Sequence, residues 1–115
     1  MPRDVLTLIE DIELRCERII QYTDNKNSEE FFQEMRNTDA ALYNLIVIGE
    51  AVKNLPPVIR SNYADRIPFS SIAGARDIYA HEYFCLNYEL IWGTLTEDVP
   101  KLLREIKRLK KQLKQ

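Results

Sequence analysis

The chain has a single histidine, two cysteines, one tryptophan and three glycines among its 115 residues. The two cysteines, Cys16 and Cys85, have neither metal-ligand nor redox spacing, so we expect reduced thiols in a cytoplasmic protein. One histidine and two scattered cysteines fall short of a transition-metal ligand set, so we expect no metal and no other cofactor. The longest nearly apolar run, residues 40–49, is too short to cross a bilayer. The sequence therefore predicts neither a metal centre nor a membrane protein.

The remaining composition is typical of a folded helical domain. Hydrophobic residues make up 45% of the chain and charged residues 30%, which favours folding over disorder. The length suits one domain over residues 1–115, and the scarcity of glycine and proline favours helices. Charge is uneven: residues 101–115 hold seven basic residues against Glu105 alone, a net of +6, so residues 1–100 carry −8 of the total −2. This basic helix end either contacts something acidic or is a solvated helix face.

Apolar periodicity predicts the first helices. A stripe with steps of four and three predicts a helix over residues 4–22 that Asp4 can cap. Asn27 or Ser28 is expected to cap a short helical piece, because Glu29 and Glu30 are favourable in a first turn. The stripe consists of Val5, Ile9, Ile12, Cys16 and Ile19, and the short piece is anchored by Phe31, Phe32 and Met35.

Residues 40–55 are apolar nearly all round, which predicts a central helix buried on several sides. Residues 37–39, Asn-Thr-Asp, are interpreted as a new cap or a bend before it, and Pro56-Pro57 ends it. Glu50 is unusual in this segment. It is either a capped or paired structural carboxylate, or it holds Arg76 or a partner residue in place, because a buried acid needs a partner.

Residues 58–63 are expected to form a short helical turn. A further helix begins near residues 68–70 and runs through Tyr79, and Asn87 caps a last helix whose apolar stripe Pro100 should kink or break near Val99. The sequence therefore predicts an all-α, up-and-down bundle of four principal helices with short extra turns. The last stripe consists of Ile91, Leu95, Leu102, Ile106, Leu109 and Leu113.

The only histidine lies in residues 76–84, Arg-Asp-Ile-Tyr-Ala-His-Glu-Tyr-Phe. Histidine exchanges a proton near neutral pH, and arginine offers a planar fork of donors suited to phosphate. Arg76, Asp77, His81 and Tyr83 together are typical of a phosphodiester-processing site. The plainer interpretation is a satisfied polar histidine at a helix end and a surface arginine.

The spacing Arg-polar-x-x-x-His, followed by x-Tyr, resembles the signature of the HEPN domain family, and more narrowly its HepT toxin branch. Ordered matches accompany it: residues 3–6, Arg-Asp-Val-Leu; residues 44–51, Asn-Leu-Ile-Val-Ile-Gly-Glu-Ala; residues 72–77, Ile-Ala-Gly-Ala-Arg-Asp; and Tyr-Phe-x-x-Asn at residues 83–87. The resemblance runs from about residue 3 to residue 103. Phe69, Ala75 and Tyr79 depart from the family pattern without removing a proposed catalytic group.

The resemblance implies a HEPN-like fold and a metal-independent endoribonuclease that acts on RNA. On the residues' own terms, His81 can remove the proton of a 2′-hydroxyl and later protonate the leaving oxygen. Arg76 can stabilise the charge on the pentavalent phosphate, Asp77 can orient the imidazole, and Tyr83 can donate to a phosphate or stack on a base. Because one histidine serves both proton transfers awkwardly, we expect a homodimer that brings two motifs together.

The resemblance also implies a type VII-like toxin–antitoxin pair, in which a cognate minimal nucleotidyltransferase silences the toxin by attaching AMP to Tyr83. A purely structural Tyr83, packed beside Phe84 at a helix end, is the plainer alternative. For the whole protein, the alternative function is a non-catalytic nucleotide- or partner-binding helical dimer, or a purely structural one.

Overall fold

The structure, a computed structural model, describes residues 4–67, 71, 72, 74 and 87–115. In chain order the elements are α1 (Val5–Thr23), α2 (Ser28–Gln33), α3 (Met35–Lys53), α4 (Pro57–Asn62), α6 (Tyr88–Gly93), the π-helical segment η2 (Thr94–Asp98) and α7 (Val99–Leu113). All secondary structure in the described residues is helical, which confirms the all-α prediction.

α1 follows the predicted apolar stripe. Ile9, Ile12, Cys16 and Ile19 are fully buried, whereas Val5 at the start of the stripe is only partly buried. Asp4 occupies the N-cap position, but its side chain accepts no hydrogen bond from the helix. Periodicity therefore predicted the buried face of α1 correctly, and the expected side-chain cap at Asp4 is wrong.

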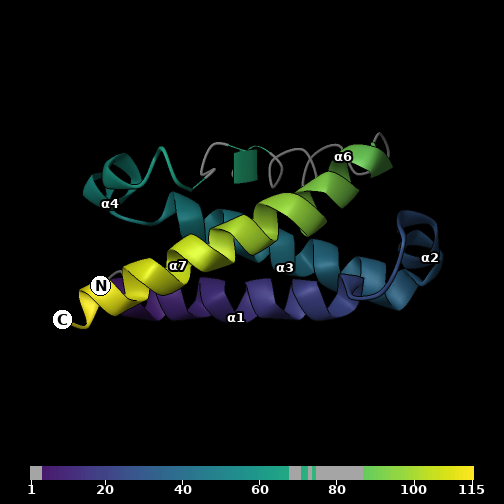
Figure 1. The fold of residues 1–115 in the computed structure, drawn as a ribbon, viewed down its shortest axis with the longest axis horizontal. Helices are drawn as coiled ribbons and strands as arrows, with labels where there is room; N and C mark the ends of the chain where they lie inside the picture. Colours follow the sequence, from purple (N-terminus) through teal and green to yellow (C-terminus); the bar gives the residue numbers. More distant parts are fainter. Residues whose placement is uncertain (1–3, 68–70, 73, 75–86) are drawn as a thin grey trace.

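Three long helical runs lie side by side: α1, α3, and the run formed by α6, η2 and α7. α1 contacts both α3 and α7, and Figure 1 shows α3 returning antiparallel to α1 while α7 crosses over them toward the same end as the N-terminus. Both chain ends therefore lie at one end of the bundle, and α2 lies at the other. The core between the runs includes Leu45 and Ile48 of α3 and Leu102 and Ile106 of α7, all fully buried.

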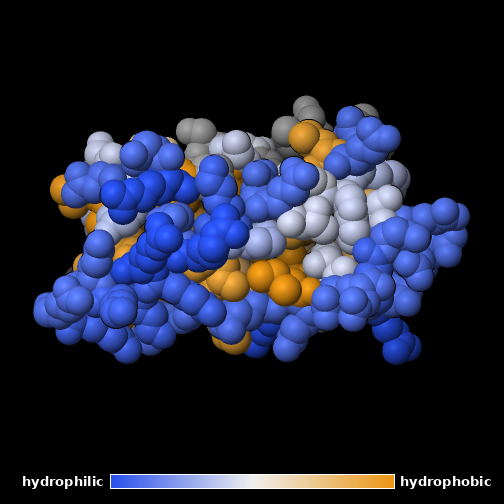
Figure 2. Space-filling model, in the orientation of Figure 1, coloured by the Kyte–Doolittle hydropathy of each residue, from blue (hydrophilic) through white to orange (hydrophobic). Residues whose placement is uncertain are grey.

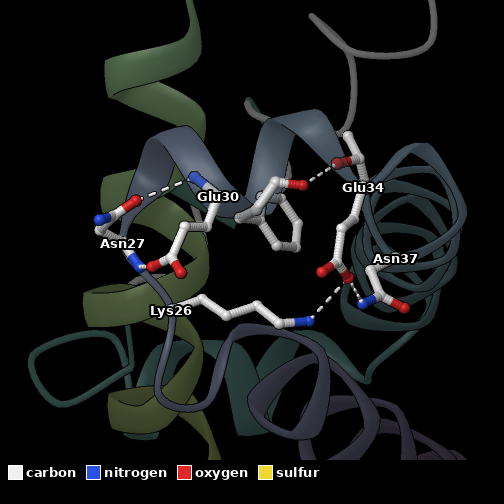
Figure 3. A network of polar contacts seen from close by, with 7 residues as sticks. Lys26, Asn27, Glu30, Glu34 and Asn37 are labelled. Carbon is white, nitrogen blue, oxygen red and sulfur yellow. Dashed lines mark hydrogen bonds and ion pairs between the residues drawn. The ribbon is translucent and has the colours of Figure 1, made fainter.

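A polar network holds α2 at its end of the bundle (Figure 3). The Asn27 side chain accepts from the Glu30 backbone N–H at 2.9 Å, and the Glu30 carboxylate accepts from the Asn27 backbone N–H at 3.0 Å. This reciprocal capping box satisfies two donors that a helix start leaves open. Lys26 and Asn37 both donate to Oε2 of Glu34, at 3.1 and 2.7 Å. The cap predicted at residues 27–28 is therefore at Asn27.

The central helix begins earlier than the sequence predicted, at Met35 instead of residue 40. The polar residues 37–39, interpreted as a cap or a bend, lie inside α3, and the side chains of two of them bond to the α2–α3 junction. Asn37 donates to Glu34, and the Thr38 hydroxyl donates to the carbonyl of Phe31 at 2.6 Å. Met35 is the first residue of α3 and is 68% exposed, so the expectation that it anchors the short helical piece is wrong.

The last helical run changes its hydrogen-bonding pattern just before Pro100. Asn87 caps α6 by accepting from the Leu90 backbone N–H at 3.1 Å, as predicted. The Val99 N–H then bonds to the Thr94 carbonyl, five residues back, and α7 begins with Pro100 in its first turn. Proline has no N–H and clashes with the carbonyl four residues earlier, so a π-helical turn accommodates it without ending the run.

The apolar stripe predicted for the last helix is largely confirmed, whereas most of the predicted motif helix is not described. The last apolar stripe is buried from Ile91 through Leu109, whereas Leu113 is 42% exposed. The helix expected to carry the motif lies mostly outside the described residues. The part of it that the structure describes, Ser71, Ile72 and Gly74, is helical. No helix among the described residues is both long and apolar enough to cross a membrane.

Candidate functional site

The proposed catalytic residues lie outside the described part of the chain. This applies to Arg76, Asp77, His81 and Tyr83, so their mutual geometry stays a prediction. Glu50 is the one predicted site residue that the structure describes. It is half-buried in the last turn of α3, and its backbone carbonyl accepts from the side-chain amide of Asn54 at 2.9 Å. Its proposed contact with Arg76 lies outside the described residues.

The segments that flank the motif are packed into the core. On the N-terminal side, Ile67 is 1% exposed and Ile72 is fully buried, and the Tyr63 hydroxyl donates to the side-chain oxygen of Gln112 near the end of α7. On the C-terminal side, Asn87 caps α6 and Ile91 is fully buried. The chain is therefore fixed to the bundle shortly before and shortly after the motif, which is a rigid support of the kind that a catalytic segment needs.

An aromatic pocket of about 180 Å³, which the sequence did not predict, lies between α2 and α6. Its rings contact one another: Phe32 lies 4.7 Å from Tyr88 and 6.3 Å from Trp92, measured between ring centroids. Glu29, Glu89 and Ser28 complete the lining. The four-residue spacing of Tyr88 and Trp92 places them on one helix face. This face of α6 packs against α2, which lies some 60 residues earlier in the chain, and no local sequence pattern predicts that contact.

The buried thiol of Cys16 is expected to be unreactive. Its burial in α1, followed by the nearby carboxylates of Glu17 and Glu13, raises its pKa to about 12. The thiolate is the reactive form of cysteine, so this pKa leaves Cys16 as a packing residue at neutral pH. Cys85 lies outside the described residues. Within the described ranges, no group of three or more His, Cys, Asp or Glu side chains is arranged to hold a metal ion.

The comparisons with known proteins identify the family. The sequence profile of a family described as "Ribonuclease HepT-like" matches residues 12–109, which is most of the chain and includes the Arg76–His81 motif. The chain belongs to the HepT-like family. This membership confirms the family resemblance drawn from the motif and its ordered companions.

Three curated relatives match along nearly their whole length. A protein named "Putative RNase" of Caldanaerobacter subterraneus subsp. tengcongensis is 38% identical over 101 residues, covering 88% of this chain and 89% of the relative. One of the same description from Methanocaldococcus jannaschii is 36% identical over 114 residues, covering 98% and 93%. The "Probable ribonuclease HepT" of Thermococcus cleftensis is 32% identical over 111 residues, covering 96% and 100%. No solved structure matches the chain significantly.

Proposed function

We propose that this chain is a metal-independent endoribonuclease whose reaction is carried by Arg76 and His81. The observation that carries the proposal is membership of the HepT-like family across residues 12–109, together with the ribonuclease names of its full-length relatives. The residue chemistry supports the same conclusion, because a histidine and an arginine five residues apart offer a proton shuttle and a phosphate clamp.

The proposed reaction needs only the RNA and the side chains. The neutral imidazole of His81 accepts the proton of a 2′-hydroxyl, whose oxygen attacks the adjacent phosphorus. The bond from phosphorus to the 5′-oxygen breaks, and that oxygen receives a proton from an imidazolium, of His81 or of its copy across a dimer. Arg76 neutralises the charge that builds on the phosphoryl oxygens. Asp77 orients the imidazole, and Glu50 supports Arg76. The products are a 2′,3′-cyclic phosphate and a 5′-hydroxyl.

A homodimer belongs to the proposal because one histidine serves both proton transfers poorly. Two motifs that meet across a two-fold axis would supply two histidines and two arginines to one cleft. Sedimentation equilibrium of the purified protein at micromolar concentration is expected to show a dimer. A monomer that still cleaves RNA at those concentrations would rule out the composite cleft without affecting the roles of the two residues.

Single substitutions test the catalytic assignment. His81→Ala and Arg76→Ala are each expected to abolish cleavage of RNA while circular dichroism stays that of the parent, and a chelator should leave the parent's rate unchanged. The matched control is Arg66→Ala, which removes an exposed arginine outside the motif and is expected to retain the parent's activity. Parental cleavage by His81→Ala protein would refute the assignment.

We further propose that the chain is the toxin of a type VII-like toxin–antitoxin pair, silenced when a cognate minimal nucleotidyltransferase attaches AMP to Tyr83. AMP would place a phosphodiester anion where Arg76 must meet the substrate. Co-expression with an adjacent nucleotidyltransferase is expected to add AMP to the Tyr83 peptide in mass spectrometry, and Tyr83→Phe protein should escape this modification. An unmodified peptide beside an active partner would remove this regulatory proposal only.

A further inference from the structure

The outer side of α7 and its C-cap residue present a row of cations, which we call the basic face: Arg104, Lys107 and Lys111 of the helix, and Lys114 at its C-cap. All four are exposed. Their spacings of three, four and three residues place them on one side of the helix, and at 1.5 Å per residue the row is about 15 Å long. Figure 2 shows strongly hydrophilic side chains gathered over this part of α7. From residue 104 to residue 111, every exposed residue is a lysine or an arginine.

Two other cations of α7, Arg108 and Lys110, are already paired with carboxylates. Glu105, the only acid in the helix, is buried, and its Oε1 accepts from Nη1 of Arg108 at 3.0 Å. Lys110 turns toward α1, where its Nζ lies 2.9 Å from Glu13 and 3.4 Å from Glu10. In contrast, the four cations of the basic face form no ion pair within the part of the chain that the structure describes. Their charge is therefore available to a ligand.

The chemistry of the basic face favours a phosphate backbone over an acidic protein. Protein interfaces have an apolar core with aromatic anchors, and lysine is depleted there. The basic face has no such core between Arg104 and Lys111, because only cations are exposed. A linear row of arginine and lysine suits a linear row of phosphates, which position a nucleic acid without reading its sequence. The rest of the chain, at −8, repels a polyanion and so directs it to this face.

We propose that the basic face of α7 binds the phosphate backbone of RNA, as a surface separate from the Arg76–His81 motif. This inference rests on the proposed ribonuclease function. It assigns Arg104, Lys107, Lys111 and Lys114 to holding the substrate and not to the bond-breaking step. Their loss therefore raises KM for long RNA and leaves kcat at saturating RNA unchanged.

The test compares two quadruple variants of equal charge. The first replaces Arg104, Lys107, Lys111 and Lys114 with glutamine. The control replaces the exposed residues Arg18, Arg36, Arg60 and Arg66 with glutamine, so that both variants change the net charge from −2 to −6. Circular dichroism and thermal melting establish that both variants are folded. Binding is measured by fluorescence anisotropy with a labelled, fully 2′-O-methylated single-stranded RNA, which cannot be cleaved by 2′-hydroxyl attack.

The salt dependence of binding is the decisive measurement. Each phosphate contact to a single strand contributes a slope of about −0.7 to log K against log salt, so losing four contacts flattens the slope by up to about 3. We expect weaker binding and this flatter slope for the basic-face variant, with the slope of the control close to that of the parent. Equal affinities and slopes for the two variants would overturn the inference.

Two further outcomes separate this inference from the function on which it rests. If the parent cleaves RNA and both variants keep its KM, the basic face is not a substrate surface and the ribonuclease function stands. If the basic-face variant binds RNA like the control but no longer binds the nucleotidyltransferase, the surface docks an acidic protein and the inference is wrong. If the parent neither binds nor cleaves RNA, the proposed function itself fails and the inference fails with it.

Discussion

Nζ of Lys110 in α7 lies 2.9 Å from Oε1 of Glu13 in α1, a link between residues 97 positions apart in the chain. The same ammonium lies 3.4 Å from Oε2 of Glu10. The pairs join the basic C-terminal helix to the acidic first helix along the side where the two pack. One lysine of the basic end thus has a structural role, and its neighbours on the basic face do not share it.

We expect Lys110→Met to lower the melting temperature, because it leaves Glu10 and Glu13 without their cation. The difference from the parent should shrink in 1 M salt, which screens partly exposed pairs. Lys111→Met is the matched control, since Lys111 is an exposed neighbour that forms no such pair among the described residues, and it should melt close to the parent. Equal melting temperatures for the two variants would show that the pairs contribute no stability.

The same contact predicts an alkaline effect. The hydrogen bond that Lys110 donates to Glu13, and then the negative charge of Glu13, raise the pKa of Lys110 above the usual 10.5. A raised pKa in the folded state means that this stabilisation is complete below 10.5 and is lost as pH rises through the raised value. Chemical denaturation of the parent and Lys110→Met proteins across pH 9 to 12 should therefore give stabilities that converge at the alkaline end. A constant difference would contradict this linkage.

The capping box of α2 supplies a prediction about stability. Asn27→Ala removes the acceptor for the Glu30 backbone N–H and should lower the free energy of unfolding by about 0.5–2 kcal/mol. Asn62→Ala, at the exposed end of α4, is the control and should change stability little. Urea unfolding followed by circular dichroism measures both. A loss at Asn62 as large as that at Asn27 would show that the cap is not the cause.

Burial of Cys16 predicts an unreactive thiol. Because its pKa is raised to about 12, protein carrying Cys85→Ser should give no colour with Ellman's reagent at pH 8 while folded, and one thiol equivalent after unfolding. Prompt reaction of the folded protein would show that Cys16 is accessible as a thiolate.

Local patterns predicted most of the described fold. The stripe of α1 and the caps at Asn27 and Asn87 depend on residues a few positions apart, so the sequence contains their whole signal. The start of α3 was misplaced because Thr38 bonds to Phe31, a partner that its own local sequence does not indicate. The π-helical turn before Pro100 appeared in the sequence only as an expected kink or break.

For the candidate site too, features that depend on nearby residues were predictable, and features that depend on packing between distant helices were not. The family was predictable because the identifying residues lie in short, ordered segments, and the family match confirms it, whereas the roles of the motif residues stay a prediction. The pocket of Phe32, Tyr88 and Trp92 was not predictable, because it depends on how α2 packs against α6. The basic end was visible as a charge excess. Separating the paired Lys110 from the unpaired basic face required the contact between α7 and α1.

The chemical ends of the RNA products test the central claim most directly. If the neighbouring 2′-hydroxyl is the nucleophile and His81 moves its proton, purified protein in the presence of a chelator should leave a 2′,3′-cyclic phosphate and a 5′-hydroxyl. Mass spectrometry of a short cleaved oligonucleotide distinguishes these ends, with His81→Ala protein as the blank. Products that carry a 5′-phosphate and a 3′-hydroxyl would show attack by water and contradict the proposed mechanism.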